Sequence, residues 1–533
     1  MPTLFTKNYK EFSVIENGAV IKTFSGAKLA NKCLPGDSVV LTDDGCRLVE
    51  RCIQPIIAGL LELNSKVRFG FSGRNVPIYL FVPFNETHPP FIVGCSEKDT
   101  SVNRLALVKF EGVWEEGFPR GNLQRLLPVD ADTEALFWTY SPLACEKYKG
   151  DMPVIADMDG RQALSAGTFH IDPPGCKDVD DVLTFDGNHH VIITIADVSA
   201  TIHSGHPLDV RASKICQTFY QDGIPKHMFP QSLSETQMTL LDGAKPGLSL
   251  RVNLKTLACD WFESVVQVEK TYTYESIYEN AELCDRLRHM ASCLGLCTED
   301  KLTTGDSHKW VEIAMKFYNI QAAKLLKANG LGLLRSHSAP DSEKLAAYTK
   351  IDPELVFLAY KSATYVKPEA ECVKHWGLGE EVYTHATSPI RRYADLLNQR
   401  ALKRILFGNG GSSGQISVET IEQMNRVAVC AKQHDRDYAF MCAVKKAPTG
   451  SVDGKLLAVK DLGDGNVKLS LYIKSWGLIA KAFYKTVDED LYKIISKDET
   501  FTIALVIGKL YKLSYHTDMR LRSWKRRVIL RLE

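Results

Sequence analysis

The densest group of acidic side chains in this sequence is an aspartate cluster in the segment GTFHIDPPGCKDVDDVLTF. Its members, which lie within ten residues between two apolar stretches, are Asp172, Asp178, Asp180 and Asp181. The Pro-Pro-Gly sequence at 173–175 favours a rigid turn, so Asp172 can face the other three across it. In an extended segment, Asp178 and Asp180 share one face and Asp181 points to the other.

Such a cluster indicates a bound cation, because neighbouring carboxylates repel one another and a buried charge without a partner is costly. Ligands that are all oxygen favour Mg²⁺ or Mn²⁺ over zinc. A metal held by carboxylates can generate hydroxide and neutralise charge on a phosphodiester oxygen, and two ions about 3.5–4 Å apart would hold both the attacking and the leaving oxygen. A structural Ca²⁺ loop and a solvated acidic turn stay open as alternatives, although the segment lacks the Glu of an EF-hand loop.

A second group follows about 200 residues later, in EEVYTHATSPIRRYADLLNQRALKRIL. Pro389 comes after Thr and Ser, which predicts a capped helix that begins at Pro389. The free N–H groups of that helix start, beside Arg391 and Arg392, would suit a phosphate or a developing oxyanion. In the alternative interpretation both arginines pair with acids such as Asp395.

The elements that must position these residues change character along the chain. Residues 1–52 and 53–135 read as two small β-barrels, since β-branched runs alternate with Gly, Asn, Asp and Pro turns. Residues 136–446 contain long helical patterns broken by strands, including one that ends at Asn329-Gly330. Residues 447–533 return to β patterns that fit one OB-type barrel.

Composition limits the class of protein. With 533 residues the chain is expected to hold three or four domains, and 45% hydrophobic residues exclude wholesale disorder. No apolar run approaches the roughly 18–20 residues that span a bilayer, and the start lacks a signal pattern. The 14 cysteines include no CxxC, so zinc-site spacing is absent and reduced thiols are expected. We therefore expect a soluble, cytoplasmic protein.

The near-neutral total charge conceals a basic end. Residues 445–533 contain 18 Lys and Arg against 10 Asp and Glu, a balance of +8, which is typical of a segment that binds polyanions. Four aromatics lie among the lysines of this end: Tyr472, Trp476, Phe483 and Tyr484. This mixture suits contact with RNA, and packing in a barrel core would explain at least half of the aromatics.

The two motifs carry a specific family resemblance. HIDPPGCKDVDDVL and YTHATSPIRRYADLLNQR resemble the signatures of the RNB family of 3′→5′ exoribonucleases, which includes ribonucleases II and R. Between them, ITIADVS, FYQDGIPKHMFPQSLS, WVEIAMKFYNIQAA and LLRSHSAPD follow in family order. The resemblance implies a multidomain α+β protein whose central α/β RNB core is flanked by small β-barrels of the cold-shock and OB types.

The resemblance also implies an activity. It predicts a processive-type 3′→5′ exoribonuclease that hydrolyses single-stranded RNA to 5′-mononucleotides with Mg²⁺, for which Mn²⁺ can substitute. The four aspartates would hold the metal, with Asp180 the most critical for the chemistry. Arg391 would stabilise charge on the transferring phosphoryl group, Arg392 would contact RNA, and Tyr220 would stack on the terminal base. We expect a monomer that needs neither a membrane nor a nucleotide cofactor.

Some positions depart from the family pattern. Thr194 and Gln399 stand where a histidine is usual, and Ala386 replaces an aromatic. Asp197 is interpreted as a cap or brace behind the metal site, and His337 as a hydrogen-bonded core residue. The main rival hypothesis is a catalytically inactive RNA-binding protein of the same fold; a phosphodiesterase for DNA or a small nucleotide and a Ca²⁺-stabilised structural protein are the others.

Overall fold

The fold is described from a computed structural model that covers most of the chain. The described residues are 2–6, 11–16, 19–26, 33–34, 36–51, 56–85, 88–111, 117–128, 130–154, 158–164, 166–187, 189–295, 306–408, 416–487, 490–496, 502–518 and 527–533. The chain divides into two compact units, one of residues 1–145 with 432–533 and one of residues 146–431. Within the described residues, no helix is both long and apolar enough to cross a membrane.

The amino-terminal part of the first unit consists of two β structures. A five-stranded antiparallel sheet contains β1 (Thr3–Phe5), β2 (Glu11–Glu16), β3 (Ala19–Ser25), β4 (Ser38–Thr42) and β5 (Gly45–Glu50). A closed barrel contains β6 (Ile56–Leu61), β7 (Ile78–Pro83), β8 (Phe91–Gly94), β9 (Arg104–Phe110) and β10 (Arg120–Leu126). Alternate strand residues of both structures meet in one buried cluster, in which Phe12 lies with Phe81 and Phe91.

The carboxyl-terminal part of the same unit is a seven-stranded sheet of order β26-β25-β24-β23-β22-β27-β28. Its strands are β22 (Thr449–Gly463), β23 (Asn466–Ile473), β24 (Leu478–Val487), β25 (Asp490–Ile495), β26 (Thr502–Ala504), β27 (Leu510–Thr517) and β28 (Val528–Leu532). The helices of this unit are α1 (Asp132–Tyr140), α2 (Pro142–Cys145) and the end of α9 (Val418–Lys446). Tyr140 of α1 donates a hydrogen bond to Asp437 of α9 at 2.6 Å.

The second unit is built on a mixed seven-stranded sheet of order β11-β18-β17-β14-β13-β12-β19. Its strands are β11 (Gln162–Leu164), β12 (Thr168–Ile171), β13 (Asp181–Asp186), β14 (His190–Ala196), β17 (Lys245–Asn253), β18 (Cys259–Val266) and β19 (Lys270–Tyr272). Two small hairpins accompany it: β15 (Phe219–Gln221) with β16 (Ile224–Lys226), and β20 (Leu334–Ser336) with β21 (Thr364–Val366). The structure is thus a mixed α+β protein with a closed barrel and further sheets, as the sequence predicts.

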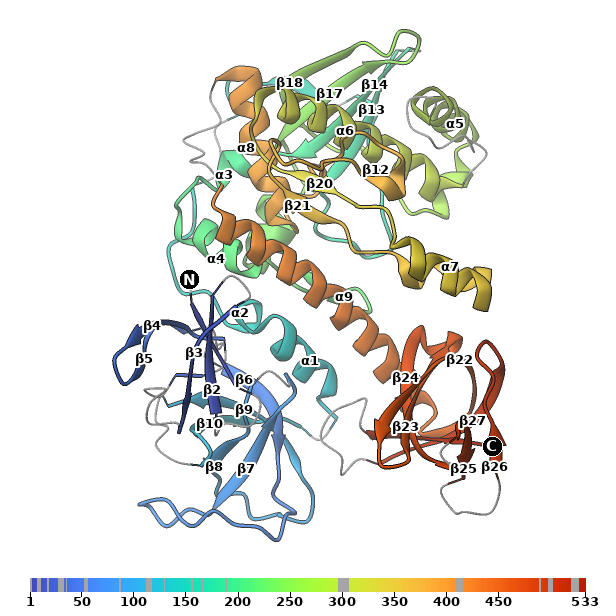
Figure 1. The fold of residues 1–533 in the computed structure, drawn as a ribbon. Coiled ribbons are helices and arrows are strands. Elements are labelled where there is room, and N and C mark those ends of the chain that lie inside the picture. The colour runs from blue at the N-terminus through green and yellow to red at the C-terminus, as the bar shows by residue number, and fades with distance from the viewer. Residues whose placement is uncertain are drawn as a thin grey trace. The chain divides into compact units, whose positions relative to one another are not determined.

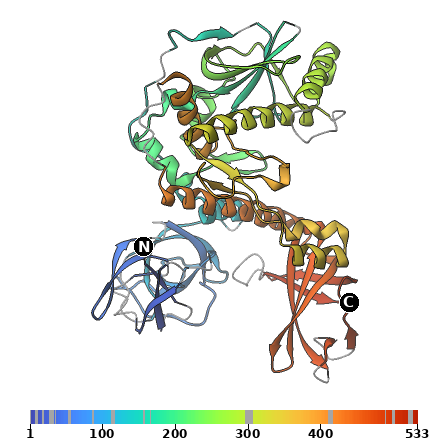
Figure 2. The ribbon, with the colours of Figure 1, turned by 45° about the horizontal axis from the view of Figure 1, so that its top comes forward.

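Helices cover one face of this central sheet. The α-helices of the unit are α3 (Val198–Thr201), α4 (Pro207–Ile215), α5 (Ala281–Gly295), α6 (Ser307–Asn329), α7 (Ser342–Ile351), α8 (Tyr393–Phe407) and the start of α9. Figures 1 and 2 show α6 lying along the sheet, and its residues Phe317, Tyr318 and Ala322 join the strands in one buried cluster. The predicted stop of this helix is confirmed, since Gly330 follows it with φ +62°.

Candidate active site

The four aspartates lie where one strand of the central sheet ends and its neighbour begins. Asp172 follows β12, and the other three lie directly before or at the start of β13, which pairs with β12 in antiparallel fashion. The predicted turn at 173–175 is present: the Cys176 N–H donates to the Pro173 carbonyl at 3.2 Å. Gly175 has φ +82°, a conformation that side chains rarely allow. The turn returns the chain, so that the charge of Asp172 acts on Asp181, while Asp178 and Asp181 act on Asp180.

Asp180 is the most enclosed carboxylate of the cluster, with a side chain that is 2% exposed. Its Oδ1 accepts a hydrogen bond from the Ile390 N–H at 2.8 Å, and its Oδ2 lies 3.3 Å from Arg391 Nε. Burial raises the pKa of Asp180 well above its ordinary value. The Arg391 guanidinium opposes that rise, and the carboxylates of Asp178 and Asp181 add to it.

Asp181 and Asp172 influence each other across the turn. Burial, followed by the charge of Asp172, raises the pKa of Asp181 to about 7. Asp172 is more open, with a side chain that is 25% exposed, and its Oδ2 lies 3.1 Å from Nδ1 of His170. Arg391 and Arg392 oppose this rise without cancelling it, so the ionised form of Asp181 is disfavoured in the absence of a further cation.

Asp178 has two neighbours on the same oxygen atom. The Tyr220 hydroxyl of β15 donates to Asp178 Oδ2 at 2.6 Å. Burial and then the Asp178 charge raise the pKa of Tyr220, so the phenol stays protonated and remains a donor. The second neighbour is His227, whose Nδ1 lies 3.9 Å from Asp178 Oδ2 and whose Nε2 lies 2.8 Å from Glu235 Oε1. Neither His227 nor Glu235 is among the predicted site residues.

The loop that carries the two arginines differs from the prediction. The helix expected to begin at Pro389 begins instead at Tyr393, and the residues before it form a turn. Asp395 Oδ1 accepts the hydrogen bond of the Ser388 N–H at 2.8 Å, while Asp180 takes the N–H two residues later. The prediction of a helix with free N–H groups from Pro389 onward is therefore wrong. Two carboxylates hold the chain in a turn there: the nearby Asp395 and the distant Asp180.

The two arginines have different partners. Arg391 lies against Asp180 and keeps 44% of its side chain exposed. Arg392 donates through Nη2 to Asp395 Oδ1 at 2.9 Å and is 25% exposed. Arg392 thus follows the alternative in which it pairs with Asp395, whereas Arg391 faces the aspartate cluster.

Tyr220 and Arg391 are carried by one hydrogen-bonded frame. The Thr218 N–H donates to the Arg391 carbonyl at 2.9 Å, and the Tyr393 N–H donates to the Cys216 carbonyl at 2.9 Å. The strand that leads to Tyr220 is therefore paired with the arginine loop, and both side chains reach the aspartate cluster from this pair of segments.

Asp197 directly follows β14 and caps α3, as expected, because its side chain accepts the Ala200 N–H. Its Oδ2 accepts hydrogen bonds from Lys403 at 2.6 Å and from Arg161 at 2.8 Å. Burial alone would raise the pKa of Asp197, but the charges of Lys403 and Arg161 outweigh burial and hold it below its ordinary value. Nothing in the sequence points to these two cations, which lie far from Asp197 along the chain.

Two positions that depart from the family pattern, Gln399 and Thr194, make hydrogen bonds within the fold. The Gln399 side chain accepts from the Ser199 N–H at 2.9 Å and donates to the Ala196 carbonyl at 2.8 Å, which joins α8 to α3 and β14. The buried Thr194 hydroxyl lies 2.7 Å from Ser249 Oγ. These substitutions thus leave the aspartate cluster unchanged.

His337 and Ala386 are also accounted for by packing and hydrogen bonds. His337 Nδ1 accepts from the Gly377 N–H at 3.1 Å, and its Nε2 donates to the Lys361 carbonyl at 2.8 Å. Ala386 is buried, and its N–H donates to Asn319 Oδ1 at 2.8 Å. Both of its ring nitrogens being engaged, His337 is a structural residue.

The donor atoms of the cluster fit a hard divalent cation. Four carboxylates supply only oxygen, and neighbouring carboxylates add to the burial that raises the pKa values of Asp180 and Asp181. As they are placed, no three His, Cys, Asp or Glu side chains of the described residues surround a single point closely enough to hold an ion. The kinds of donor atom therefore fit Mg²⁺ or Mn²⁺. In this structure the carboxylates are not arranged around a single ion position.

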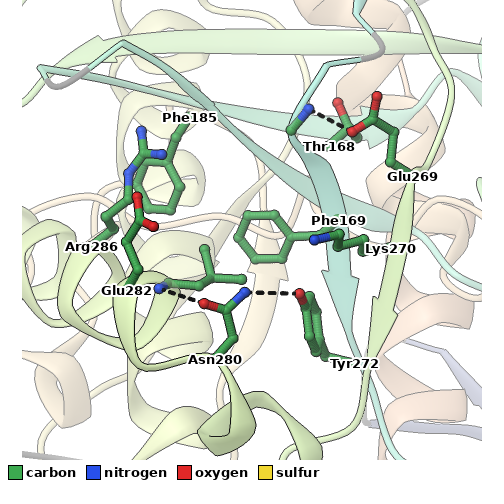
Figure 3. A pocket seen from close by; sticks show the side chains of 11 residues that line it. Thr168, Phe169, Phe185, Glu269, Lys270, Tyr272, Asn280, Glu282 and Arg286 are labelled. Atoms are coloured by element: carbon green, nitrogen blue, oxygen red, sulfur yellow. Dashed lines mark hydrogen bonds between the residues drawn. The ribbon is translucent and has the colours of Figure 1, made fainter.

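A separate hollow of about 200 Å³ lies at one edge of the central sheet (Figure 3). Phe169 of β12, Phe185 of β13 and Tyr272 of β19 form its aromatic wall, and Arg286 of α5 stacks over Phe185 at 4.4 Å. None of the predicted site residues lines this hollow, so it is distinct from the aspartate cluster.

Comparison with protein families supports the resemblance of the motifs. Residues 161–304 and 346–408 match the model of the RNB domain. Both regions include the residues described above: the aspartate cluster, Tyr220 and His227 lie in the first, and the arginine loop lies in the second.

Curated relatives are about one quarter identical to this chain, over regions longer than the match to the RNB domain. Ribonuclease R of Helicobacter pylori is 26% identical over 342 residues, which cover 50% of this chain and 53% of that protein. Exosome complex exonuclease RRP44 of Homo sapiens is 24% identical over 457 residues, or 66% of this chain and 48% of that protein. The chain spans about half the length of the curated relatives it matches.

Solved structures share the fold. Mycoplasma genitalium RNase R, in its apo form, aligns with a TM-score of 0.71 at 15% identity and covers 100% of both chains. The yeast pseudonuclease Ssd1 aligns with a TM-score of 0.64 at 14% identity, over 100% of this chain and 96% of that chain. The M. genitalium protein is also known in complex with ribose-methylated single-stranded RNA. The central region of this chain therefore matches the RNB domain, and the chain shares the fold of RNase R.

Proposed function

We propose that this protein is a metal-dependent 3′→5′ exoribonuclease that hydrolyses single-stranded RNA to 5′-mononucleotides in a processive manner. The observation that carries the proposal is the buried Asp180, which feels the charges of Asp178 and Asp181 and lies against Arg391 in the region that matches the RNB domain. A protein that only binds RNA has no need of four crowded carboxylates whose charge is under-compensated.

Asp172, Asp178, Asp180 and Asp181 are the proposed ligands of Mg²⁺, for which Mn²⁺ can substitute. When bound, the metal would lower the pKa of a water molecule and neutralise charge on the scissile phosphate. Asp180 is the most critical residue, because its two oxygens are fixed by Ile390 N–H and Arg391. The remaining carboxylates would turn toward the metal from the positions described above.

Other residues of the site would hold the RNA. The exposed part of Arg391 would meet the transferring phosphoryl group, and Arg392 would contact the backbone. Tyr220 would offer its ring to the terminal base while its hydroxyl stays on Asp178. Complexes of the M. genitalium relative with RNA support an RNA substrate for this fold.

The carboxyl-terminal sheet offers a second RNA-binding surface. Cross-strand pairing places Lys468 opposite Phe483 and Ser470 opposite Lys481 on an outward face, whereas Trp476 and Tyr484 are buried. We propose that residues 447–533 form an OB-type RNA-binding domain after an RNB domain at 136–446. The β structures at 1–52 and 53–135 would be cold-shock-like domains, and the protein would act as a monomer.

The test uses a 5′-labelled single-stranded RNA of about 30 nucleotides, with Mg²⁺ or with excess chelator. The wild type is expected to give a ladder that shortens from the 3′ end, and neither chelator-treated protein nor Asp180→Asn should give one. A DNA strand of the same sequence should stay intact. Binding without cleavage in every lane would contradict the proposal and would place the chain with pseudonucleases, as Ssd1 is described.

A further inference from the structure

The main chain that carries two of the aspartates lies outside the central sheet. Residues 176–180 belong to no strand, and β13 begins at Asp181. Val179, which lies between Asp178 and Asp180, is buried with 1% of its surface exposed. Its N–H and C=O have no strand to pair with, and a buried main-chain group without a hydrogen bond is costly. Other parts of the fold must therefore supply their partners.

Both partners come from two consecutive residues about 60 positions later in the chain. The Val179 N–H donates to the hydroxyl oxygen of Thr239 at 3.0 Å, and the Val179 carbonyl accepts from the Leu240 N–H at 3.1 Å. Thr239 and Leu240 are completely buried. The Thr239 side chain thus holds the peptide group between Asp178 and Val179, where a strand partner would otherwise do so.

The support of Thr239 is a π-helix, Leu233–Gln237. The Met238 N–H donates to the Leu233 carbonyl at 2.8 Å, which closes the π-turn directly before Thr239. Lys245 Nζ donates to the Thr236 carbonyl at 2.5 Å, so the end of the π-helix is itself fixed. Such π-turns are rare and recur at functional sites. The Thr239 hydroxyl is therefore presented to Val179 from a rigid segment.

We propose that Thr239 is a positioning residue of the active site, whose hydroxyl fixes the directions of the Asp178 and Asp180 side chains through the main chain of Val179. This inference rests on the proposed function. Side chains two positions apart in an extended segment point to the same side, and rotation of the peptide group between them would turn them apart. Removal of the hydroxyl leaves a buried N–H without its acceptor, which favours such a rotation.

The experiment uses the full chain and a pair of substitutions at Thr239. Thr239→Val keeps nearly the same shape and removes the hydroxyl, whereas Thr239→Ser keeps the hydroxyl. Thr194→Val is the matched control, because Thr194 is equally buried and its hydroxyl lies 2.7 Å from Ser249 Oγ, not against the main chain of the aspartates. Hydrolysis of the labelled RNA is measured at varied RNA and Mg²⁺ concentrations. Hydrogen exchange of the Val179 amide is measured by mass spectrometry on the metal-free protein.

We expect Thr239→Val to lower kcat by about 10- to 100-fold and to raise the Mg²⁺ concentration that gives half the maximal rate. The KM for RNA should stay unchanged, because Arg391 and Tyr220 keep their own supports. Thr239→Ser and Thr194→Val should behave like the wild type in both respects. The Val179 amide should exchange slowly in the wild type and in Thr239→Ser, and faster in Thr239→Val at a temperature where each protein is folded.

Three results would overturn the role of Thr239 and leave the exoribonuclease in place. These are an unchanged kcat and Mg²⁺ requirement in Thr239→Val, a loss in Thr239→Ser as large as in Thr239→Val, and an equal loss in Thr194→Val. Fast exchange of the Val179 amide in the wild type would also overturn it, and this result needs no variant to fold. A folded wild type that hydrolyses no RNA would overturn the proposed function and the role of Thr239 together.

Discussion

Two buried aspartates of the second unit have opposite electrostatic surroundings. Asp197 is fully enclosed, and two cations, Lys403 and Arg161, hold its pKa below the ordinary value. Asp180 is equally enclosed, but it faces other carboxylates and has Arg391 as its cationic contact, so its pKa is raised. Cations of the fold neutralise the charge of Asp197. The charge of Asp180 would need an external cation for the same effect. Burial alone would not distinguish the two.

The largest expected effect is on activity. Asp180→Asn should lower the rate of RNA hydrolysis by about 10³-fold or more, because it removes a metal ligand without changing the shape of the side chain. Asp197→Asn should retain most of the activity at a temperature where it is folded. Single-turnover assays of both variants with the same labelled RNA measure this; equal losses would break the comparison.

For stability, Asp197→Asn should have the larger effect and Asp180→Asn the smaller one. Asp197→Asn takes one of two carboxylates from Lys403 and Arg161, which keep Glu263, and we expect it to lower the free energy of unfolding by about 2 kcal/mol. Asp180→Asn removes an under-compensated charge and should leave stability unchanged or raised. Chemical denaturation of the two metal-free variants measures the difference, and a more stable Asp197→Asn would be inconsistent with the bracing role.

Mg²⁺ should stabilise the folded protein only when Asp180 is present. A ligand at about 100 times its Kd stabilises the folded state by about 2.7 kcal/mol. The wild type and Asp197→Asn should therefore melt at a higher temperature with Mg²⁺ than with chelator, whereas Asp180→Asn should not. Differential scanning fluorimetry detects the shift, and a shift of equal size in all three proteins would point to an ion bound elsewhere.

The smallest effect is the pH dependence of stability. The pKa of Asp197 is lower in the folded than in the unfolded protein, so its contribution is complete above the unfolded pKa of about 3.9 and is lost as pH falls through the folded pKa. The wild type should therefore lose stability more steeply than Asp197→Asn as the pH falls below about 4. Parallel curves for the two proteins would mean that Asp197 is not ionised in the fold.

Features that depend on nearby residues could be predicted from the sequence. The turn at 173–175, the helix that stops at Gly330 and the strands of the carboxyl-terminal sheet all follow from local spacing and residue type. The nearness of Asp172 to Asp181 also follows, because they lie on the two sides of that single turn. Local sequence is sufficient in these cases, since the partners are within a few residues.

Features that depend on distant partners could not be predicted. The start of α8 was placed at Pro389 because the capping residues are local, but the N–H of Ile390 is taken by Asp180 from the other motif. The pairs of Asp197 with Arg161 and Lys403 likewise join segments far apart in the chain. No periodicity or spacing connects such residues, so only the folded arrangement reveals them.

The pairing of the Tyr220 strand with the Arg391 loop has a consequence for how RNA would advance. Backbone hydrogen bonds from Thr218 to Arg391 and from Tyr393 to Cys216 fix the separation between the ring that would hold the last base and the guanidinium that would hold its phosphate. Under the proposed function, this pairing would keep the segment that holds the last base beside the segment that holds its phosphate while the strand advances.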